Sequence, residues 1–362
     1  MARTAVVLFN MGGPDSLDAV EPFLFNLFSD PAIIRLPRLF RHFVAGRISR
    51  RRAPIAQEIY RQMGGKSPIV EQTLAQAKAL EAALSDLGEV RVFVAMRYWH
   101  PRSEVAAVEV KGFMPDRIML LPLYPQFSTT TTKSSLVDWY RSAHNIGLAA
   151  SSVTTSALCC YATTEGMIEA QAELIAPLLN AAAAKGPVRL LLSAHGLPER
   201  IVKSGDPYAW HVEQTAARIV AKLGIDGLDW ALCYQSRVGP MRWIGPATDD
   251  EIRRAGGEGM ALVVAPIAFV SEHSETLVEL DIEYRDLARA SGVPAYDRAP
   301  AVACHPAFIS ALADLTRQCL NRAPAEDDSM FSHTGGRVCP AHHKGCPLVA
   351  GLPGAGVTLN GR

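Results

Sequence analysis

Residues 188–196 read Val-Arg-Leu-Leu-Leu-Ser-Ala-His-Gly, and this stretch decides the fold class. Val188–Leu192 is a nearly continuous apolar run, and it leads into Ser193, His195 and Gly196. Runs of this kind are typical of parallel strands that are covered on both faces, because a strand with one wet face alternates apolar and polar residues. We therefore predict a buried parallel strand with His195 at its carboxyl end.

The same pattern recurs along the chain, with helical stretches in between. Strand-like runs lie at Ala5–Phe9, Arg91–Ala95, Ile118–Leu123, Leu228–Cys233 and Ala261–Val270, and amphipathic stretches at Pro68–Leu87, Thr164–Ala184 and Tyr208–Leu223. Strand–helix alternation predicts an α/β protein with doubly wound parallel sheets. A chain of 362 residues is long enough for about two domains of ~150 residues each.

Composition excludes several classes of protein. Basic and acidic residues both number 36, so net charge gives no reason to expect nucleic acid as a partner. Seven cysteines scattered through a long chain do not form a disulfide framework. The N-terminal apolar run is too short for a signal peptide, and none of the runs reaches the ~18 residues of a membrane span. We expect a cytoplasmic protein.

Ligands of open α/β sheets bind at the carboxyl ends of the strands, so the residues that follow each run are the candidate site. These segments are Asn10–Pro14, Met96–His100, Tyr124–Ser128, Ser193–Pro198, Tyr234–Pro240 with Trp243 close behind, and Ser271–Glu275. Any one of them could simply turn the chain and pack. Together they bring imidazole, carboxylate, sulfur and aromatic groups to one predicted edge, which favours a site.

An acidic row starts where the last of these strands ends. Glu272, Glu275, Glu279 and Glu283 are spaced 3, 4 and 4 residues apart, which places them on one helix face where like charges destabilise the helix. A solvated acidic face is the alternative. His273 lies among the acids, and carboxylate and imidazole groups are ligands for a divalent cation. We interpret the row as a metal path, and His195 as a group that transfers protons near neutral pH, although a lone histidine can be purely structural.

These strand-end motifs together resemble those of ferrochelatases, which insert ferrous iron into protoporphyrin or coproporphyrin. The resemblance covers roughly residues 4–320. It runs through Asn10-Met11-Gly12-Gly13-Pro14, Gly64-Gly65-Lys66-Ser67-Pro68, Ser193-Ala194-His195-Gly196, Gly205-Asp206-Pro207-Tyr208, Tyr234-Gln235-Ser236-Arg237 and Ser271-Glu272-His273-Ser274-Glu275.

The resemblance implies the class II chelatase fold, with two similar doubly wound parallel-sheet domains at 1–160 and 161–320 and a C-terminal extension at 321–362. It also implies that the chain makes protohaem from protoporphyrin IX and ferrous iron. In that case His195 accepts a pyrrole proton and binds the substrate iron with Glu275, while His273, Glu279 and Glu283 continue the metal path. Met11, Arg97, Tyr98 and Trp243 match residues that contact the porphyrin.

Residues 31–52 mix arginines with bulky apolar side chains. Such a mixture suits an element that lies on an anionic membrane surface, and the corresponding region of ferrochelatases forms a lip of the porphyrin pocket. We expect peripheral contact with the inner face of the membrane. The alternative is an ordinary surface helix, which Pro37 and Gly46 would interrupt.

The extension carries Cys339-Pro340-Ala341-His342-His343-Lys344-Gly345-Cys346, in which two cysteines flank two histidines. This pattern could hold zinc or contribute to an iron–sulfur cluster. Some ferrochelatases carry a [2Fe-2S] cluster on such an extension, and by that resemblance we expect Cys160, Cys319, Cys339 and Cys346 as ligands, with Cys159 as a competitor. We expect Cys233 and Cys304 to be buried thiols without a metal.

Three other functions stay open at this point. The chain could be a coproporphyrin ferrochelatase, a cobalt chelatase, or a non-catalytic haem or metal carrier. The sequence also leaves the oligomeric state open, and a homodimer is compatible with it.

Overall fold

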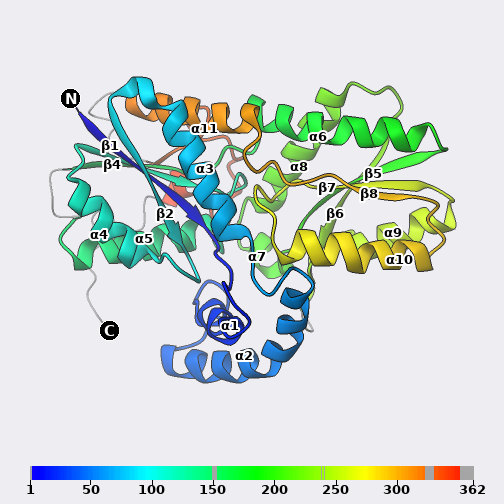
Figure 1. The fold of residues 1–362 in the computed structure, drawn as a ribbon, viewed down its shortest axis with the longest axis horizontal. Helices are drawn as coiled ribbons and strands as arrows, with labels where there is room; N and C mark the ends of the chain where they lie inside the picture. Colours follow the sequence, from blue (N-terminus) through cyan, green and yellow to red (C-terminus); the bar gives the residue numbers. More distant parts are fainter. Residues whose placement is uncertain (1, 149–152, 238, 240, 323–329, 351–362) are drawn as a thin grey trace.

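The structure, a computed structural model, describes residues 2–148, 153–237, 239, 241–322 and 330–350. Two parallel sheets lie side by side, and helices cover them (Figure 1). The order of the first sheet is β2-β1-β3-β4-β9, and that of the second is β6-β5-β7-β8. All strand pairs are parallel. The predicted class II chelatase fold, with two parallel α/β sheets, is therefore confirmed.

The strands of the first sheet are β1 (Arg3–Asn10), β2 (Glu89–Met96), β3 (Arg117–Pro122), β4 (Thr154–Leu158) and β9 (Met330–Phe331), and those of the second are β5 (Val188–His195), β6 (Asp229–Gln235), β7 (Ala261–Pro266) and β8 (Tyr296–Arg298). The helices are α1 (Val20–Phe28), α2 (Arg38–Arg61), α3 (Ile69–Ala83), η1 (Ser85–Leu87), α4 (Ser103–Phe113), α5 (Thr132–Asn145), α6 (Glu165–Ala183), α7 (Glu199–Lys203), α8 (Tyr208–Leu223), α9 (Thr248–Gly257), η2 (Glu275–Glu283), α10 (Tyr284–Ala290), α11 (Pro306–Leu320) and α12 (Pro347–Ala350).

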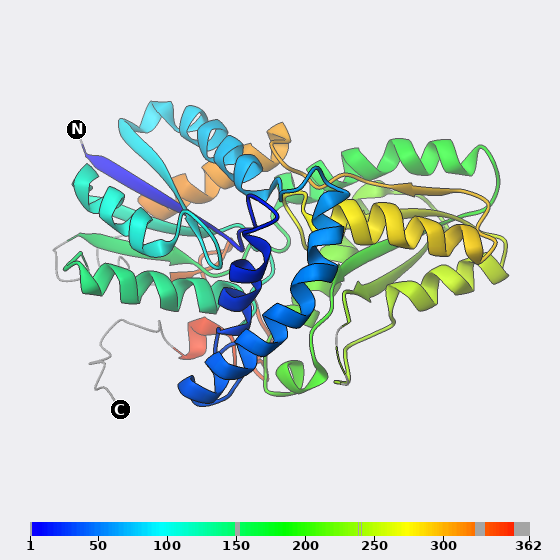
Figure 2. The same ribbon diagram turned by 60° about the horizontal axis from the view of Figure 1, so that its bottom comes forward.

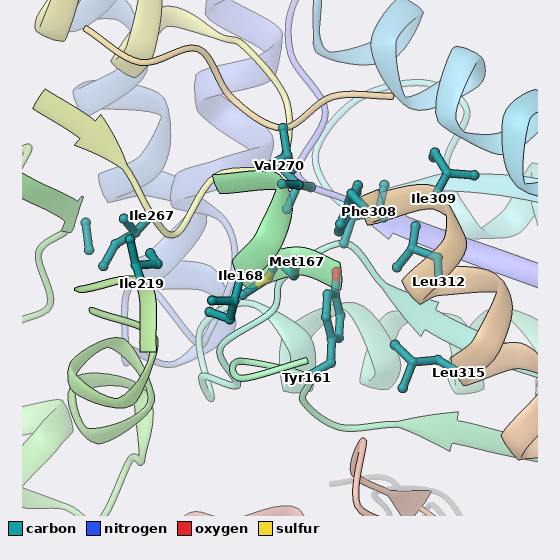
Figure 3. Packing of buried hydrophobic residues seen from close by; sticks show 14 of the residues in the cluster. Tyr161, Met167, Ile168, Ile219, Ile267, Val270, Phe308, Ile309, Leu312 and Leu315 are labelled. Atoms are coloured by element: carbon teal, nitrogen blue, oxygen red, sulfur yellow. The ribbon is translucent and has the colours of Figure 1, made fainter. Parts of the chain in front are cut away.

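One hydrophobic core packs against one face of both sheets. It joins Leu8 and Leu121 of the first sheet to Leu190 and Val263 of the second through residues of α3, α6, α8 and α11. Figure 3 shows part of it, with Met167 and Ile168 of α6 near Phe308 and Leu312 of α11. Separate clusters lie on the far face of each sheet. The two predicted domains therefore share a core, and the predicted boundaries at 160/161 and 320/321 fall between β4 and α6 and directly after α11.

Two predicted elements differ in the structure. β7 ends at Pro266 and not at Val270, because Ile267 and Val270 are buried in the shared core as part of a loop (Figure 3), and apolar character does not distinguish such a loop from a strand. Of the interruptions expected at Pro37 and Gly46, the first is present, since α2 begins directly after Pro37, and the second is absent, since α2 continues through Gly46 and Pro54. Packing against α1 supports this helix, and a single helical glycine costs only about 1 kcal/mol.

Helices α1 and α2 form a hairpin below the junction of the two sheets (Figures 1 and 2). Their own small core includes Phe23, Leu24, Tyr60 and Tyr98, with Met11 packed against it. The hairpin therefore lies next to the strand ends that carry the candidate residues. None of the helices in the described ranges is both long and apolar enough to cross a membrane.

Candidate active site

The site centres on an imidazole–carboxylate pair between two strand-end segments. His195 is the last residue of β5, and Glu275 is the first residue of η2, which follows β7. The Nδ1 of His195 lies 2.7 Å from Oε2 of Glu275. β5 and β7 are neighbours in the sheet, so both groups arise at one edge, as the order of the strand ends predicts. The ring of Trp243 meets the ring of His195 edge-on, with centroids 6.4 Å apart.

Each member of the pair stabilises the charged form of the other. Burial by itself would lower the pKa of His195, but the charge of Glu275 and the hydrogen bond to it raise this pKa above its ordinary value. Burial would likewise raise the pKa of Glu275, yet the charge and hydrogen bond of His195 lower it to about 2. Glu275 is therefore a carboxylate throughout the neutral range. The His195 side chain keeps 37% of its surface exposed, so it can reach a ligand.

A second carboxylate, Glu279, lies one step further along η2. Its Oε1 accepts hydrogen bonds from the N–H of Ser236 at 2.8 Å and from the hydroxyl of Tyr284 at 3.1 Å, and its Oε2 accepts one from Nε2 of Gln235 at 3.1 Å. Ser236 also donates from its hydroxyl to both Glu275 and Glu279. Burial and the nearby charge of Glu275 raise the pKa of Glu279. Glu275 and Glu279 therefore form a coupled acidic pair with pKa values moved apart.

The acidic row differs from the expected α-helix. Residues Glu275–Glu283 form a π-helix, a rare geometry that often marks functional sites. Glu283 is exposed at the outer end of the row. It lines a hollow of about 680 Å³ together with Glu279, Trp243, Arg237 and Asp249. The row therefore leads from the His195–Glu275 pair to solvent.

Glu272 is not part of this row, which corrects the four-residue interpretation. Its carboxylate binds Nη1 of Arg298 at 2.9 and 3.1 Å and accepts the N–H of Ala301 at 2.9 Å. Arg298 comes from β8, a strand too short to recognise in the sequence. Glu272 lies before the first turn of η2, so its side chain follows the loop and not the helix face.

His273 is buried beside the pair. Its Nε2 lies 3.9 Å from Oε2 of Glu275, and its ring lies 4.5 Å from the ring of Phe269. Burial lowers its pKa, so this imidazole is neutral at neutral pH. Its Nδ1 has no hydrogen-bond partner among the described residues. The position next to Glu275 was predicted, whereas the burial was not.

Comparison with known proteins identifies this arrangement. The family model for ferrochelatase matches residues 3–320. A ferrochelatase of Phenylobacterium zucineum is 51% identical over 347 residues, which cover 95% of this chain and 97% of the relative. One of Caulobacter vibrioides is 49% identical over 352 residues, covering 96% and 98%. The chain belongs to the ferrochelatase family. It is therefore a metal chelatase, an enzyme of the lyase class.

The fold comparison agrees with this family. A solved structure of SirB from Bacillus subtilis, obtained with Fe3+, has a TM-score of 0.50 to this chain. It is 13% identical in sequence and covers 88% of this chain, and 95% of SirB is covered. At this identity the likeness concerns the fold alone.

Three of the four predicted porphyrin contacts, Met11, Arg97 and Tyr98, lie next to the α1–α2 hairpin. Arg97 donates to Asp30 from Nη2 at 2.8 Å and to Ser134 from Nε at 2.7 Å. The hydroxyl of Tyr98 donates to the same Oδ2 of Asp30 at 2.9 Å. Tyr98 is buried, and Met11 packs partly buried against the same core. Asp30, which the sequence did not single out, therefore holds both predicted residues in place.

Tyr60 is a second residue that the sequence did not single out. It lies near the end of α2, is buried, and is hydrogen-bonded to Ser274 beside the charge of Glu275. Burial raises its pKa to about 12, so the phenol stays protonated. The hairpin of the first half thus reaches the segment of the second half that carries His273 and Glu275. No local pattern signalled this contact, because it joins residues more than 200 positions apart.

Amides from α3 fix the loop that carries His273 and Glu275. Gln76 is fully buried. Its Nε2 donates to the carbonyls of Val270 at 2.8 Å and Ala303 at 3.0 Å, and its Oε1 accepts the hydroxyl of Ser271 at 3.2 Å. The Oε1 of Gln72 accepts the N–H of Glu272 at 2.7 Å. The first half of the chain therefore positions the acidic segment of the second half.

The cysteines of the extension lie against β4. The Sγ atoms of Cys159 and Cys160 are 3.3 Å apart, and a hydrogen bond joins Cys339 to Cys346, lowering the pKa of Cys346 to about 6. The hydrogen bond with Cys159 and burial raise the pKa of Cys160, and nearby Cys339 and Cys346 raise it further. Cys319, by contrast, belongs to the core with Leu158 and Phe331, whereas Cys159 and Cys160 belong to the core on the other face of that sheet.

The remaining thiols were partly misjudged. Cys233 is buried, as expected, but Cys304 is exposed in the turn before α11. Within the described ranges, no three or more His, Cys, Asp or Glu side chains are gathered as a ready metal-binding group. The metal-ligand assignments therefore remain predictions.

Proposed function

We propose that this ferrochelatase inserts ferrous iron into protoporphyrin IX to form protohaem, with His195 as the base and Glu275 as its partner. The observation that carries the proposal is the 2.7 Å contact between His195 Nδ1 and Glu275 Oε2 at the carboxyl ends of neighbouring strands. Coproporphyrin as the substrate and cobalt as the metal are the competing functions.

The chemistry requires removal of two protons. Iron replaces the two pyrrole N–H protons of the ring, so a base on one face speeds the reaction if it is neutral when the metal arrives. The pKa of His195 lies above its ordinary value, which favours capture of a proton. Glu275 remains a carboxylate and stabilises the imidazolium that results. Before it accepts the proton, neutral His195 supplies with Glu275 a nitrogen and oxygen donor set that suits ferrous iron; the imidazolium formed afterwards has no free lone pair for the metal.

The acidic row supplies a route for the metal. Glu283 is exposed, and Glu279 lies between Glu283 and Glu275 in η2, where Gln235 and Ser236 donate hydrogen bonds to its carboxylate. A cation can therefore pass from solvent along these carboxylates to His195 and Glu275. His273 lies beside the inner end. Met11, Arg97, Tyr98 and Trp243 would contact the ring, and the edge-on packing of Trp243 against His195 supports a position beside the macrocycle for this indole.

Turnover is tested by the iron-dependent loss of porphyrin fluorescence. The wild type is expected to consume protoporphyrin with ferrous iron, and His195→Ala to bind the porphyrin without converting it. His144→Ala, at an exposed position on α5, is the matched control and should keep its rate. Near-normal rates in His195→Ala would refute the base role. Faster turnover with coproporphyrin, or with cobalt in place of iron, would assign that substrate instead.

We also propose that α2 contacts an anionic membrane surface. The side chains of Leu39, Phe40 and Phe43 are exposed by 84%, 67% and 72%, and exposed arginines flank them at Arg38 and Arg47. Apolar groups beside basic ones suit the boundary between headgroups and acyl chains.

Co-sedimentation with anionic liposomes at low salt tests this contact. Phe43→Ser should weaken it, whereas Val108→Ser on α4, also an exposed apolar position (58%), should not. Equal binding of both variants and of the wild type would contradict the proposal.

We further propose that the two cysteines directly after β4 and those of the extension hold a [2Fe-2S] cluster. Four thiols, those of Cys159, Cys160, Cys339 and Cys346, are buried close to one another, and thiolates are the usual ligands of such clusters. The buried Nε2 of His343 has no hydrogen-bond partner among the described residues, and a metal group bound beside these thiols would give it one. A bound cluster would supply one-electron chemistry and a covalent tie between β4 and the extension.

The visible spectrum and the iron and zinc contents of the purified protein test the cluster. Cys339→Ser and Cys346→Ser should lose the absorption and the iron, and Cys233→Ser should keep both. Cys319→Ser distinguishes the proposed ligand set, which contains Cys159, from the predicted one, which contains Cys319. If the Cys319→Ser variant loses its iron, Cys319 and not Cys159 is the ligand. A colourless, zinc-containing wild type would reject the cluster.

A further inference from the structure

The extension touches the second half of the chain at a contact between two glycines. The N–H of Gly345 donates to the carbonyl of Gly205 at 2.9 Å. A Cβ on Gly345 would lie 2.8 Å from that carbonyl oxygen and 3.3 Å from Cα of Asp206. A Cβ on Gly205, whose φ is +98°, would lie 3.0 Å from the nitrogen of Lys344. Only glycine on both sides permits this approach of backbone to backbone.

Asp206, the next residue, is buried (1% exposed) and fully engaged. Its Oδ2 accepts hydrogen bonds from the N–H and the hydroxyl of Thr129 at 2.7 and 2.6 Å and from the hydroxyl of Ser128 at 3.0 Å. Its Oδ1 accepts the N–H of Tyr208 at 3.0 Å. Asp206 therefore fixes the start of α8 against the loop that follows β3.

Tyr208 connects this turn to the reacting histidine. It is buried, and its hydroxyl donates to the carbonyl oxygen of His195 at 2.9 Å. His195 is the last residue of β5, where the strand ladder ends, so this side-chain hydrogen bond continues the support of its backbone. A shift of Tyr208 would move the backbone from which the imidazole projects toward Glu275.

The same first turn of α8 meets the cysteine segment. His211 follows Tyr208 by three residues and lies on the adjoining part of the helix surface. Its Nε2 lies 3.2 Å from Sγ of Cys339, and its Nδ1 accepts the N–H of Phe127 at 3.1 Å. The extension thus contacts the start of α8 at two points. Gly345 contacts Gly205 in the turn before the helix, and Cys339 contacts His211 in the helix.

We propose that Tyr208 is a positioning residue for His195, and that docking of the extension on Gly205 sets the position of Tyr208. The proposal rests on the proposed role of His195 in catalysis. The proposal does not depend on whether the thiols of Cys339 and Cys346 bind a metal. Its consequence is that any change that lifts the extension from Gly205 slows the chemical step and leaves porphyrin binding intact.

Tyr208→Phe tests the first half of the proposal. It removes one hydroxyl and keeps the ring. We expect kcat to fall about five- to tenfold, the equivalent of one hydrogen bond, with KM for porphyrin unchanged. An unchanged kcat, or a rise in KM alone, would overturn the positioning role.

Gly345→Ala tests the second half, with Gly336→Ala as the matched control, because a Cβ on Gly336 meets nothing within 4 Å. Gly345→Ala should lower kcat as much as Tyr208→Phe does, and the double variant should lose no more than either single one. Hydrogen exchange of the peptide 193–198 should become faster in Gly345→Ala and stay unchanged in Gly336→Ala. Additive losses, or unchanged exchange in Gly345→Ala, would overturn the coupling.

Two further measurements keep the outcomes separate. Iron and zinc contents of each variant show whether Gly345→Ala acts by metal loss, and metal loss without faster exchange at 193–198 would refute the coupling. If Gly345→Ala does not fold, Asp206→Asn tests the connection between Gly205 and Tyr208. Hydrogen exchange of the peptide 193–198 at the wild-type rate in this variant would also refute the coupling. A wild type without turnover would reject the proposed function, yet the exchange experiment would still test the docking.

Discussion

Neutralising Glu275 tests the electrostatic account of the site most directly. The pKa of His195 is raised because the carboxylate of Glu275 lies 2.7 Å from its Nδ1, and that charge stabilises the imidazolium. Glu275→Gln keeps the shape of the side chain and removes the charge. The imidazolium is then less stable than before, so the pKa of His195 must fall.

The size of the fall follows from geometry and exposure. An opposite charge at this distance typically shifts a pKa by about 1–3 units. The side chains of His195 and Glu275 remain 37% and 23% exposed, and solvent screens such a pair. We therefore expect the pKa of His195 to fall by less than it would for a fully buried pair. Glu279 acts on His195 more weakly, so Glu279→Gln should lower the pKa less.

The measurement is an NMR titration of labelled histidine, which needs no turnover. Glu283→Gln, at the exposed outer end of η2, is the control and should leave the pKa of His195 unchanged. Where a variant retains activity, the acid limb of its kcat profile should move to lower pH, because His195 stays neutral to a lower pH. A pKa of His195 that is unchanged or higher in Glu275→Gln would refute the reasoning.

Two further predictions concern stability, measured by denaturant unfolding. Asp30→Ala should lower the free energy of unfolding by about 3 kcal/mol, since it leaves the buried guanidinium of Arg97 without its main partner, whereas Glu58→Ala, which breaks an exposed ion pair, should cost less than about 0.5 kcal/mol; equal losses would contradict the structure. Gly166→Ala should destabilise by about 1–3 kcal/mol, because its Cβ would lie 2.4 Å from the carbonyl oxygen of Ala307 in α11. Gly112→Ala, where a Cβ meets nothing within 4 Å, should instead gain about 0.5–1 kcal/mol, and the opposite order of these two glycines would refute the α6–α11 packing.

Much of the fold was readable from local pattern. Each of the six predicted runs overlaps a strand of the sheets, and the three predicted helical stretches contain α3, α6 and α8. The missed strands β4, β8 and β9 are 5, 3 and 2 residues long, too short to carry a period. Their existence depends on the neighbouring strand that they pair with, and the sequence does not show this partner.

The site divides in the same way. Strand direction and sheet order alone place His195, Glu275 and Glu279 at one edge, so these three could be predicted together. Glu272 was misassigned, because its partner Arg298 belongs to one of the missed strands. Asp30, Tyr60 and Gln76 carried no signal, as each acts through a contact with a distant segment.

The sequence by itself determined the parallel α/β architecture and the position of His195 at the end of a buried strand, because apolar runs and helical periods are properties of neighbouring residues. Only the tertiary structure decided that His195 meets Glu275, 80 residues away, and that Cys319 lies on the other face of the first sheet from Cys160. The same holds for the extension, whose Gly345 donates a hydrogen bond to the carbonyl of Gly205. The reason is that contacts between distant segments depend on how whole elements pack, and packing is settled by the shape of both partners at once.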